Sequence, residues 1–371
     1  GYAYVAGETT NTDFPTTVGA FQRTSPLYGA AAFLTKVNKT GTALMYSTLV
    51  SGQGADPTEA GDIAYGVAVD LIGNAYITGS TTAPDFPTTQ NAFQTNNFAA
   101  TGGANSFVTK IAPIPVFPDF DNDGGSDLLL QNPTNGGIST WFMQGATKTG
   151  AAAFSLTPPT EYALVGAGDF FADGSITLVL QSSVSNKIAF WYTSGNKNTT
   201  IPGGNFVNAT PPAGWKIVAV ADFNGDGKSD LVFQNQTSGL ISIWFMNGFL
   251  FNGGVQLPVT PLANWKVVGT GDFNADGFKD IVFQNQNTNQ IALWYMTGTT
   301  YAGGTVLTDV PAAGYKVVGV TDWSGDGSPD LLFQSAAKSQ LAVWYIQSGA
   351  FVGGDTIQAN LPGGVKVVGP R

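Results

Sequence analysis

The sequence predicts an all-β fold that is assembled from repeated units. Three observations lead to this prediction: a short acidic motif recurs five times, the segments between its copies are short runs of β-branched and aromatic residues, and no stretch keeps a helical period. Glycine, asparagine and proline separate the runs, which is typical of strands joined by tight turns.

The acidic motif reads DFNGDGKSDLVFQ at residues 222–234. Its copies begin at intervals of 50 to 53 residues, and in each copy a glutamine and a tryptophan follow at fixed distances. The first aspartates are Asp119, Asp169, Asp222, Asp272 and Asp322. The glutamines are Gln131, Gln181, Gln234, Gln284 and Gln334, and the tryptophans are Trp141, Trp191, Trp244, Trp294 and Trp344. Five copies in one register predict five equivalent structural units.

The first third of the chain carries a longer repeat of a different kind. YVAGETTNTDFPTTVGAFQ at residues 4–22 returns as YITGSTTAPDFPTTQNAFQ at residues 76–94. The sequence therefore divides into two long units over residues 1–112, five short units over residues 113–364, and a final segment over residues 365–371.

Each short unit contains four strand-like runs. In the third unit these runs cover residues 215–223, 230–234, 241–248 and 249–257. Four strands in about fifty residues, repeated along the chain, are typical of the blades of a β-propeller. A pair of β-sandwiches is the alternative, but it would not explain one acidic turn in every unit.

The two ends of the chain predict how the ring closes. Residues 365–371 copy the first strand of a unit, and GYAYVAG at the start resembles a second strand. We therefore expect one domain over residues 1–371, a single seven-bladed β-propeller with four-stranded blades, in which the C-terminal strand joins the N-terminal blade. Residues 106–118 are too few for all the strands of two complete blades, so one outer strand is expected to be missing there.

The acidic turns have the oxygen pattern of a calcium-binding loop. Asp222, Asn224, Asp226 and Asp230 stand at positions 1, 3, 5 and 9, and position 7 offers its backbone carbonyl. A glycine at position 6 allows the sharp bend around an ion. An EF-hand is excluded because position 12 is Phe233 and strands flank the turn.

Four turns are complete and predict about four bound Ca²⁺ ions. The candidate ligands are Asp119, Asp121, Asp123, Gly125 and Asp127; Asp222, Asn224, Asp226, Lys228 and Asp230; Asp272, Asn274, Asp276, Phe278 and Asp280; and Asp322, Ser324, Asp326, Ser328 and Asp330. The turn that begins at Asp169 has Phe171 and Thr177 at positions 3 and 9, so we expect it to have lost its ion. Asp-Gly and Asn-Gly turns also occur in hairpins that bind no metal. A plain hairpin would explain one aspartate in each turn, but not three or four.

Composition excludes several classes of function. The chain has no histidine and no cysteine, which removes Ser-His-Asp and Cys-His catalysis, histidine zinc sites and thiolate sites. A net charge of −10 argues against nucleic acid as a partner. No apolar run is long enough to span a bilayer, and the first residues do not look like a signal peptide, so we expect no membrane span. No paired carboxylates stand out, and we expect no enzymatic activity.

The five short units resemble FG-GAP/VCBS repeats, the family of integrin α-subunit propellers and of some seven-bladed lectins. The long units, with GNAYITGST and DFPTT, resemble the bacterial SBBP β-propeller repeat. This resemblance implies a calcium-binding propeller that is secreted or displayed on a bacterial cell surface. It does not fix a function, because related propellers occur in adhesins, lectins and lipases.

A candidate ligand face lies opposite the calcium turns. The connectors between units end in an aromatic residue in four cases, and the loops between second and third strands are rich in amides. The candidate ligand-binding residues are Tyr162, Trp215, Trp265, Tyr315, Asn235 and Asn285. Aromatic rings can stack on sugars and amides can bind their hydroxyls; alternatively, these aromatics only pack between strands. For the five repeated tryptophans, packing between blades is the favoured interpretation.

The sequence as a whole predicts a calcium-stabilised propeller that binds carbohydrate, as free glycans or glycoconjugates, through several equivalent sites. Equivalent weak sites gain avidity when they act together. The alternative is a structural or adhesive extracellular protein that binds surface proteins or itself, without sugar binding.

Overall fold

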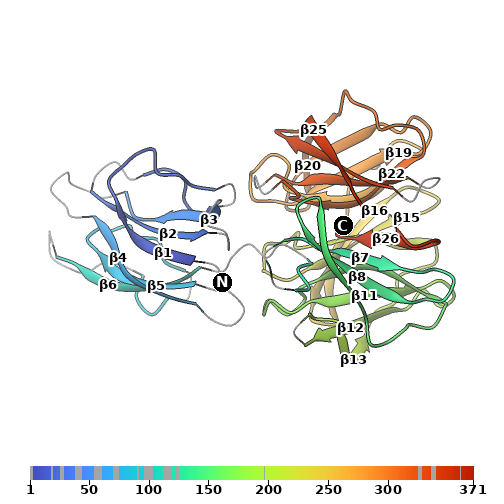
Figure 1. Ribbon diagram of the computed structural model, residues 1–371, viewed down its shortest axis with the longest axis horizontal. Coiled ribbons are helices and arrows are strands. Elements are labelled where there is room, and N and C mark those ends of the chain that lie inside the picture. Colours follow the sequence, from blue (N-terminus) through green and yellow to red (C-terminus); the bar gives the residue numbers. More distant parts are fainter. Residues whose placement is uncertain are drawn as a thin grey trace. The chain divides into compact units, whose positions relative to one another are not determined.

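The computed structural model contains strands as the only regular elements among the residues it describes, which confirms the predicted all-β class (Figure 1). The described residues are 3–17, 20–25, 29–37, 44–53, 61–69, 75–89, 92–95, 103–111, 118–121, 123, 125–195, 197–324, 328–335, 340–359 and 361–371. Within these ranges no helix is both long and apolar enough to cross a membrane.

The chain forms two compact units, Gly1–Pro115 and Val116–Arg371, and each is described by itself. The first unit contains two three-stranded antiparallel sheets, of orders β1-β2-β3 and β4-β5-β6. Their strands are β1 (Ala3–Thr9), β2 (Ala31–Val37), β3 (Leu44–Val50), β4 (Asp62–Val69), β5 (Ala75–Thr81) and β6 (Asn105–Ile111). Leu34, Ile77 and Phe107 belong to the hydrophobic core that these sheets share. Each long sequence repeat thus supplies one sheet.

The second unit contains five four-stranded sheets. Four of them follow the chain in order: β10 (Tyr162–Gly168), β11 (Thr177–Ser182), β12 (Ile188–Ser194), β13 (Thr200–Phe206); β14 (Trp215–Ala221), β15 (Asp230–Asn235), β16 (Ile241–Asn247), β17 (Leu250–Gln256); β18 (Trp265–Gly271), β19 (Asp280–Asn285), β20 (Ile291–Thr297), β21 (Thr300–Val306); and β22 (Tyr315–Thr321), β23 (Asp330–Ser335), β24 (Leu341–Gln347), β25 (Ala350–Ile357). The fifth sheet combines β26 (Lys366–Gly369) with β7 (Leu128–Gln131), β8 (Ile138–Gln144) and β9 (Thr147–Ala153).

Burial along each sheet follows from its sequence. The second strands, such as β15 with DLVFQN, are nearly continuous apolar runs that are buried on both faces. The fourth strands, such as β17, alternate between exposed and half-buried positions, as expected for an outer strand with one face in solvent. Burial therefore decreases toward the outer edge of each sheet.

The hydrophobic cores of the second unit lie between neighbouring sheets, not within them. One cluster joins Leu231 and Phe233 to the preceding sheet, and another joins Val232 and Ile243 to the following sheet. Three further clusters link the remaining pairs, including the pair that contains β7 and β23. The first strands also contact one another in the cyclic order β10, β14, β18, β22, β26. The five sheets consequently form a closed ring, the arrangement of a propeller.

In the second unit, the side chain of a repeated glutamine joins each sheet to the next by two hydrogen bonds. The Gln234 side-chain Oε1 accepts a hydrogen bond from the Val267 N–H at 3.1 Å, and its Nε2 donates to the Trp265 carbonyl at 3.1 Å. Gln131, Gln181, Gln284 and Gln334 make the same pair of bonds to Leu164 and Tyr162, Ile217 and Trp215, Val317 and Tyr315, and Val367 and Val365. The five repeated glutamines therefore link every pair of neighbouring sheets around the ring.

The predicted closure is wrong, and so is the predicted number of blades in the ring. β26 pairs with β7, with Lys366 opposite Gln131, and not with β1 (Figure 1). The ring therefore has five sheets instead of seven, and residues 1–115 form a unit of their own. A physical reason lies in the sequence: PIPVFP, which directly precedes the first acidic turn, contains three prolines, whereas KVVG of β26 contains none. Proline cannot donate to a strand ladder, so the C-terminal segment supplies this strand instead.

Replacing Gln234 by alanine leaves the Val267 N–H and the Trp265 carbonyl without their partner between two sheets. We expect the free energy of unfolding to fall by about 1–3 kcal/mol, as measured by urea denaturation followed by tryptophan fluorescence. Gln236→Ala, at an exposed neighbouring position, is the matched control and should change stability by less than about 0.5 kcal/mol. Equal stabilities of the two variants would show that the hydrogen bonds of Gln234 between sheets do not stabilise the protein.

Candidate metal centres and the connector face

Four of the acidic turns join the first strand of a sheet to the second, and the turn that begins at Asp119 leads into β7, whose first-strand partner is β26. Between β14 and β15, Gly225 and Gly227 adopt positive φ values of 75° and 81°, which favour glycine. Asp222 accepts hydrogen bonds from both glycine N–H groups, at 2.7 and 2.8 Å. The chain therefore curls around the first carboxylate of the turn, as the sequence motif predicts.

The aspartate at position 9 has a structural role that the motif alone did not reveal. Asp230 is fully buried, its Oδ2 accepts from the Phe223 N–H at 3.0 Å, and its Oδ1 accepts from the Met246 N–H at 3.0 Å. Asp127, Asp280 and Asp330 make the equivalent pairs of bonds. This carboxylate connects the turn to the third strand. Its place at the start of a wholly apolar run was the available signal that it would be buried.

The turn that begins at Asp169 differs in structure, as its sequence suggested. Thr177 stands in place of the position-9 aspartate, and its buried hydroxyl has no hydrogen-bond partner. The N–H on the third strand, at Thr193, donates instead to the Ile176 carbonyl at 3.1 Å. Asp169 itself accepts from the N–H groups of Phe171 and Gly174, at 3.0 and 2.8 Å. This turn closes on its own backbone.

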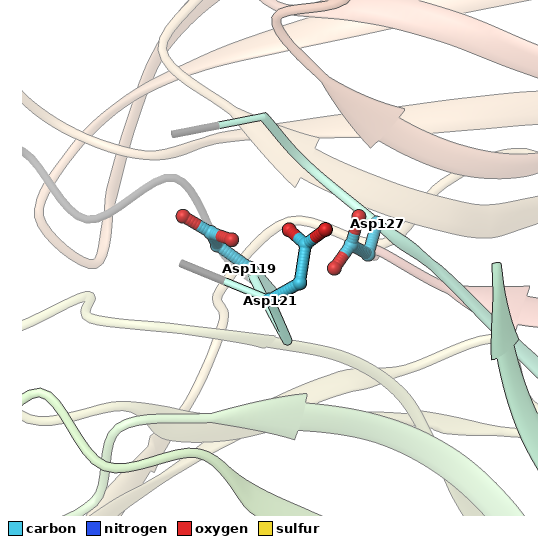
Figure 2. Close-up of side chains that lie close together, drawn as sticks. All are labelled: Asp119, Asp121 and Asp127. Carbon is cyan, nitrogen blue, oxygen red and sulfur yellow. The ribbon is translucent and has the colours of Figure 1, made fainter. Parts of the chain in front are cut away.

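The turn before β7 brings three carboxylates together (Figure 2). Asp119, Asp121 and Asp127 each place one oxygen so that all three lie within 4.8 Å of one another. Asp123, the fourth predicted acidic ligand, points its Oδ1 to the Gly125 N–H at 2.8 Å. Three convergent carboxylates at this separation have the oxygen chemistry and the charge to hold a divalent cation.

In the other predicted turns the side-chain oxygens accept backbone hydrogen bonds. Asn224 and Asp226 accept from the N–H groups of Asp226 and Lys228, and Asp272 and Asp276 accept from those of Gly277 and Phe278, all at 2.9 Å. The Asn274 Nδ2 donates to Asp276 at 2.9 Å, and the Ser324 hydroxyl donates to Asp322 at 3.3 Å. Asp326 lies outside the described residues. The remaining predicted positions, Ser328 among them, lie in the turns as the motif places them.

The connectors between sheets place the predicted aromatic residues at equivalent positions. Tyr162, Trp215, Trp265 and Tyr315 are the first residues of β10, β14, β18 and β22, and all four are half-buried. Each packs on one side against an inter-sheet hydrophobic cluster. These contacts agree with the packing interpretation, and the rings are also partly accessible.

One of these aromatics lines a cavity. Tyr315, Phe333 and Trp344, together with Pro311, Ala312 and Ala342, surround a volume of about 230 Å³ whose lining is almost entirely carbon. This volume suits a flat apolar or partly apolar group. The sequence singled out Tyr315 but not its combination with Phe333 and Trp344.

Asn235 and Asn285, predicted to bind ligand, shape the loops that follow the second strands. The Asn235 Oδ1 accepts from the N–H groups of Thr237 and Ser238 at 3.0 and 2.9 Å, and Asn285 does the same for Asn287 and Thr288. Their carboxamide oxygens are engaged within the chain, so their observed role is that of turn formers.

The repeated tryptophans pack against neighbouring aromatic side chains. Trp244 lies between Phe233 and Phe251, with ring centroids 4.8 and 4.5 Å apart. Trp294 and Trp344 have the same surroundings in their sheets, and Trp141 is buried in the cluster that spans two sheets. The ring partners of Trp244, Trp294 and Trp344 belong to their own sheets, but these tryptophans also pack against clusters that span two sheets, in agreement with the predicted packing between blades.

Comparison with known proteins identifies the repeats. Residues 272–333, which contain the acidic turns that begin at Asp272 and Asp322 and the strands β19 to β22, match the family model described as an FG-GAP-like repeat. Residues 46–87 match the model described as a β-propeller repeat. The chain therefore contains an FG-GAP-like repeat and a β-propeller repeat in these two segments. No curated protein matches it.

Solved structures similar to this propeller protein have low sequence identity. A nidogen/laminin complex chain is 13% identical, with 62% of this chain and 92% of that chain covered and a TM-score of 0.35. A Photorhabdus luminescens Tc holotoxin pore chain is 16% identical, with 98% and 18% covered and a TM-score of 0.36, so the propeller protein spans only 18% of that chain's length. A putative 6-phosphogluconolactonase from Bacteroides fragilis is 14% identical, with 99% and 97% covered and a TM-score of 0.30. These likenesses carry no conclusion about activity.

Burial dominates the electrostatics of the position-9 aspartates in the propeller. It raises the pKa of Asp127 to about 8, with a further increase from the charges of Asp121 and Asp119. Burial likewise raises the pKa of Asp330 to about 7 and those of Asp230 and Asp280 to about 6. The neighbours that act on these pKa values by charge are acidic, so a cation in the turn would relieve their repulsion.

The first unit brings together two carboxylates that are far apart in the sequence. Asp62 is buried and accepts from the Ser51 hydroxyl at 2.7 Å and the Gly52 N–H at 2.9 Å. Burial is the main cause of its raised pKa, and the charge of Asp85 adds to it. Asp85 lines a shallow hollow with Ser51 and Gln53 and accepts from the Gln53 N–H at 3.0 Å. No sequence motif indicates this proximity, because it depends on how β4 and the DFPTT segment meet in the folded unit.

In metal-free buffer, we expect the free energy of unfolding of the propeller to fall as pH rises from about 4 to about 8. Above about pH 4 the unfolded chain releases these protons, whereas the folded state keeps each one up to its raised pKa, about 6 for Asp230 and Asp280, about 7 for Asp330 and about 8 for Asp127. The folded state therefore binds more protons in this window, and each rise in pH favours unfolding. Urea denaturation in EDTA at about pH 5 and about pH 8 measures the difference. Asp127→Asn should make the fall smaller. Stability that increases across this window would contradict the assignment.

Proposed function

We propose that the protein is a calcium-stabilised recognition module that binds glycans on the face formed by the connectors and the second-to-third-strand loops. We refer to this surface as the connector face. It comprises the loops at residues 132–137, 183–187, 236–240 and 286–290, the connectors, and the first residues of the first strands. The proposal places the protein outside a bacterial cell, either secreted or on the cell surface, and assigns it no catalytic activity.

The convergence of Asp119, Asp121 and Asp127 supports calcium binding. When all three carboxylates are ionised, oxygens within 4.8 Å of one another repel unless a cation lies between them. In each complete turn, the position-9 aspartate also holds the third strand through a hydrogen bond, as at Asp230 and Met246. Calcium in these turns would therefore stabilise the links between first, second and third strands.

The half-exposed aromatic residues on the connector face are the observation that carries glycan binding. Trp215, Trp265 and Tyr315 recur at one position of successive sheets, where each packs against a core cluster and stays partly accessible. The cavity beside Tyr315 adds a concave aromatic surface of about 230 Å³. Sugars offer apolar C–H faces to such rings, and repeated sites act together in binding a multivalent glycan.

A second candidate function is protein binding or self-assembly through the outer strands. The fourth strands expose Phe206 and Val352, each 59% accessible, as well as Val306. Each outer strand also has one edge without a partner strand in its sheet. Exposed apolar side chains along open edges are surfaces through which another chain can add a strand.

Calcium binding is tested by counting ions. We expect isothermal titration of the chelator-treated protein to give about four Ca²⁺ ions per chain, and saturating calcium to raise the unfolding temperature because the ion binds only the folded turns. Asp121→Asn should remove one ion. Asp173→Asn, in the turn that lacks the position-9 aspartate, is the matched control and should leave the count unchanged. A chain that binds no calcium would refute this part of the proposal.

Glycan binding is tested on an array probed with the purified protein in millimolar calcium. We expect hits on one class of sugar and at least about a tenfold loss of affinity in Trp265→Ala, because removing an aromatic platform costs on the order of 1–2 kcal/mol. Tyr301→Ala, on an outer strand, is the control and should bind normally. A blank array from folded protein would refute glycan binding, and sedimentation would then test self-association.

A further inference from the structure

We propose that the ligand of the connector face is an acidic polysaccharide, and that Lys216, Lys266, Lys316 and Lys366 bind its carboxylate or sulfate groups. This inference rests on the proposed glycan-binding function and specifies the chemical class of its ligand. It starts from a repeat that the calcium turns do not explain.

Four of the five first strands begin with the same pair of residues, an aromatic or valine followed by lysine. The pairs are Trp215 and Lys216, Trp265 and Lys266, Tyr315 and Lys316, and Val365 and Lys366. In the remaining first strand Tyr162 is followed by Ala163. The first strands contact each other around the ring, and the four lysines stand at equivalent positions of these strands. Each lysine directly follows the aromatic residue or valine that ends a connector.

The neighbouring sheet holds three of these lysines in place. The Lys216 Nζ donates to the Asn186 Oδ1 at 3.1 Å, the Lys316 Nζ donates to the Asn289 Oδ1 at 3.2 Å, and the Lys266 Nζ donates to the Gln236 carbonyl at 3.4 Å. Asn186 is itself fixed, because its Nδ2 donates to the carbonyls of Pro211 and Pro212, both at 2.9 Å. The lysines are therefore positioned across the boundary between two sheets.

The oxygens that hold these lysines are neutral. Amide and carbonyl oxygens orient an ammonium group without cancelling its charge, and each ammonium has three N–H donors, of which one such contact uses one. Lys216, Lys266 and Lys316 are half-buried and Lys366 is exposed, so part of every side chain is accessible. A ligand could accept the remaining N–H groups.

Charge is separated between the two faces of the ring. In the described parts of the connector face, Lys187 joins the four lysines, and the carboxylates there are Glu161 and Asp309. The acidic turns lie at the other ends of the first strands: Asp222 follows Lys216 by six residues, or about 20 Å along a strand. The chain has a net charge of −10, so a positive face on it is a local feature and not a consequence of composition.

The arrangement favours a polymer with repeated negative charges over a single anion. One accessible lysine binds an anion weakly in water, so several lysines around one face must act on the same ligand to give useful affinity. An acidic polysaccharide presents its charges at intervals along the chain and also offers C–H faces to Trp215, Trp265 and Tyr315. It therefore uses both members of each aromatic and lysine pair.

The test measures affinity of the whole chain in calcium for polygalacturonate, a sulfated galactan, a neutral galactan, polyglutamate and DNA. We expect the acidic polysaccharides to bind more tightly than the neutral one, and their binding to weaken as salt rises. Lys216→Gln with Lys316→Gln should lower this affinity about fivefold or more, since two charge contacts are lost. Polygalacturonate and the sulfated galactan distinguish carboxylate from sulfate as the bound group.

Two matched double variants keep the experiment interpretable. Lys148→Gln with Lys197→Gln removes two exposed lysines near the opposite face and should leave affinity unchanged, whereas Lys216→Arg with Lys316→Arg should retain it. Equal binding of neutral galactan, equal binding of polyglutamate or DNA, or an equal loss in the Lys148 and Lys197 variant would overturn the inference. Binding only of neutral sugars would overturn it while leaving the proposed function intact; binding of no saccharide at all would overturn both.

Discussion

The second unit depends on one repeated interaction, the carboxamide of a glutamine that bonds to the backbone of the next sheet. Each sheet has a neighbour on both faces only if the ring closes. The hydrophobic clusters between sheets hold them together, but apolar packing does not by itself fix their relative orientation. The glutamines add directional hydrogen bonds, because Gln234 bonds to the backbone of both Trp265 and Val267 in the following first strand. A buried amide with both ends satisfied sets the register between sheets that apolar packing alone would leave adjustable.

The acidic turns serve the same architecture from the other end of each sheet. Asp230 links a turn to the third strand, so a group that looks in sequence like a simple metal ligand also belongs to the core. Its high pKa shows the cost of burying a carboxylate among other carboxylates. The Asp169 turn shows the alternative solution, in which Thr177 replaces the acid and the backbone of Ile176 satisfies the third strand.

The sequence predicted the all-β class, the strand repeats and the position of every acidic turn, because these depend on local patterns of alternation and glycine placement. The predictions of ring closure and blade number were wrong. The pairing of β26 with β7 joins segments far apart in the chain, and no local sequence pattern determines which strand β26 joins. Asp121 and Asp127 could be anticipated as neighbours from motif spacing. The cavity beside Tyr315 and the proximity of Asp62 to Asp85 could not, because both depend on tertiary packing.

The pairing of Lys366 with Gln131 joins residues that are 235 positions apart in the chain. Contacts at such separation form late, because the entropy of closing so long a loop must be overcome before the contact can stabilise anything. During synthesis, β7 is complete long before β26 leaves the ribosome, and its inner edge meanwhile has no partner. A chain that ends before residue 366 lacks the strand that covers this edge in the finished sheet, and an uncovered edge can pair with another molecule.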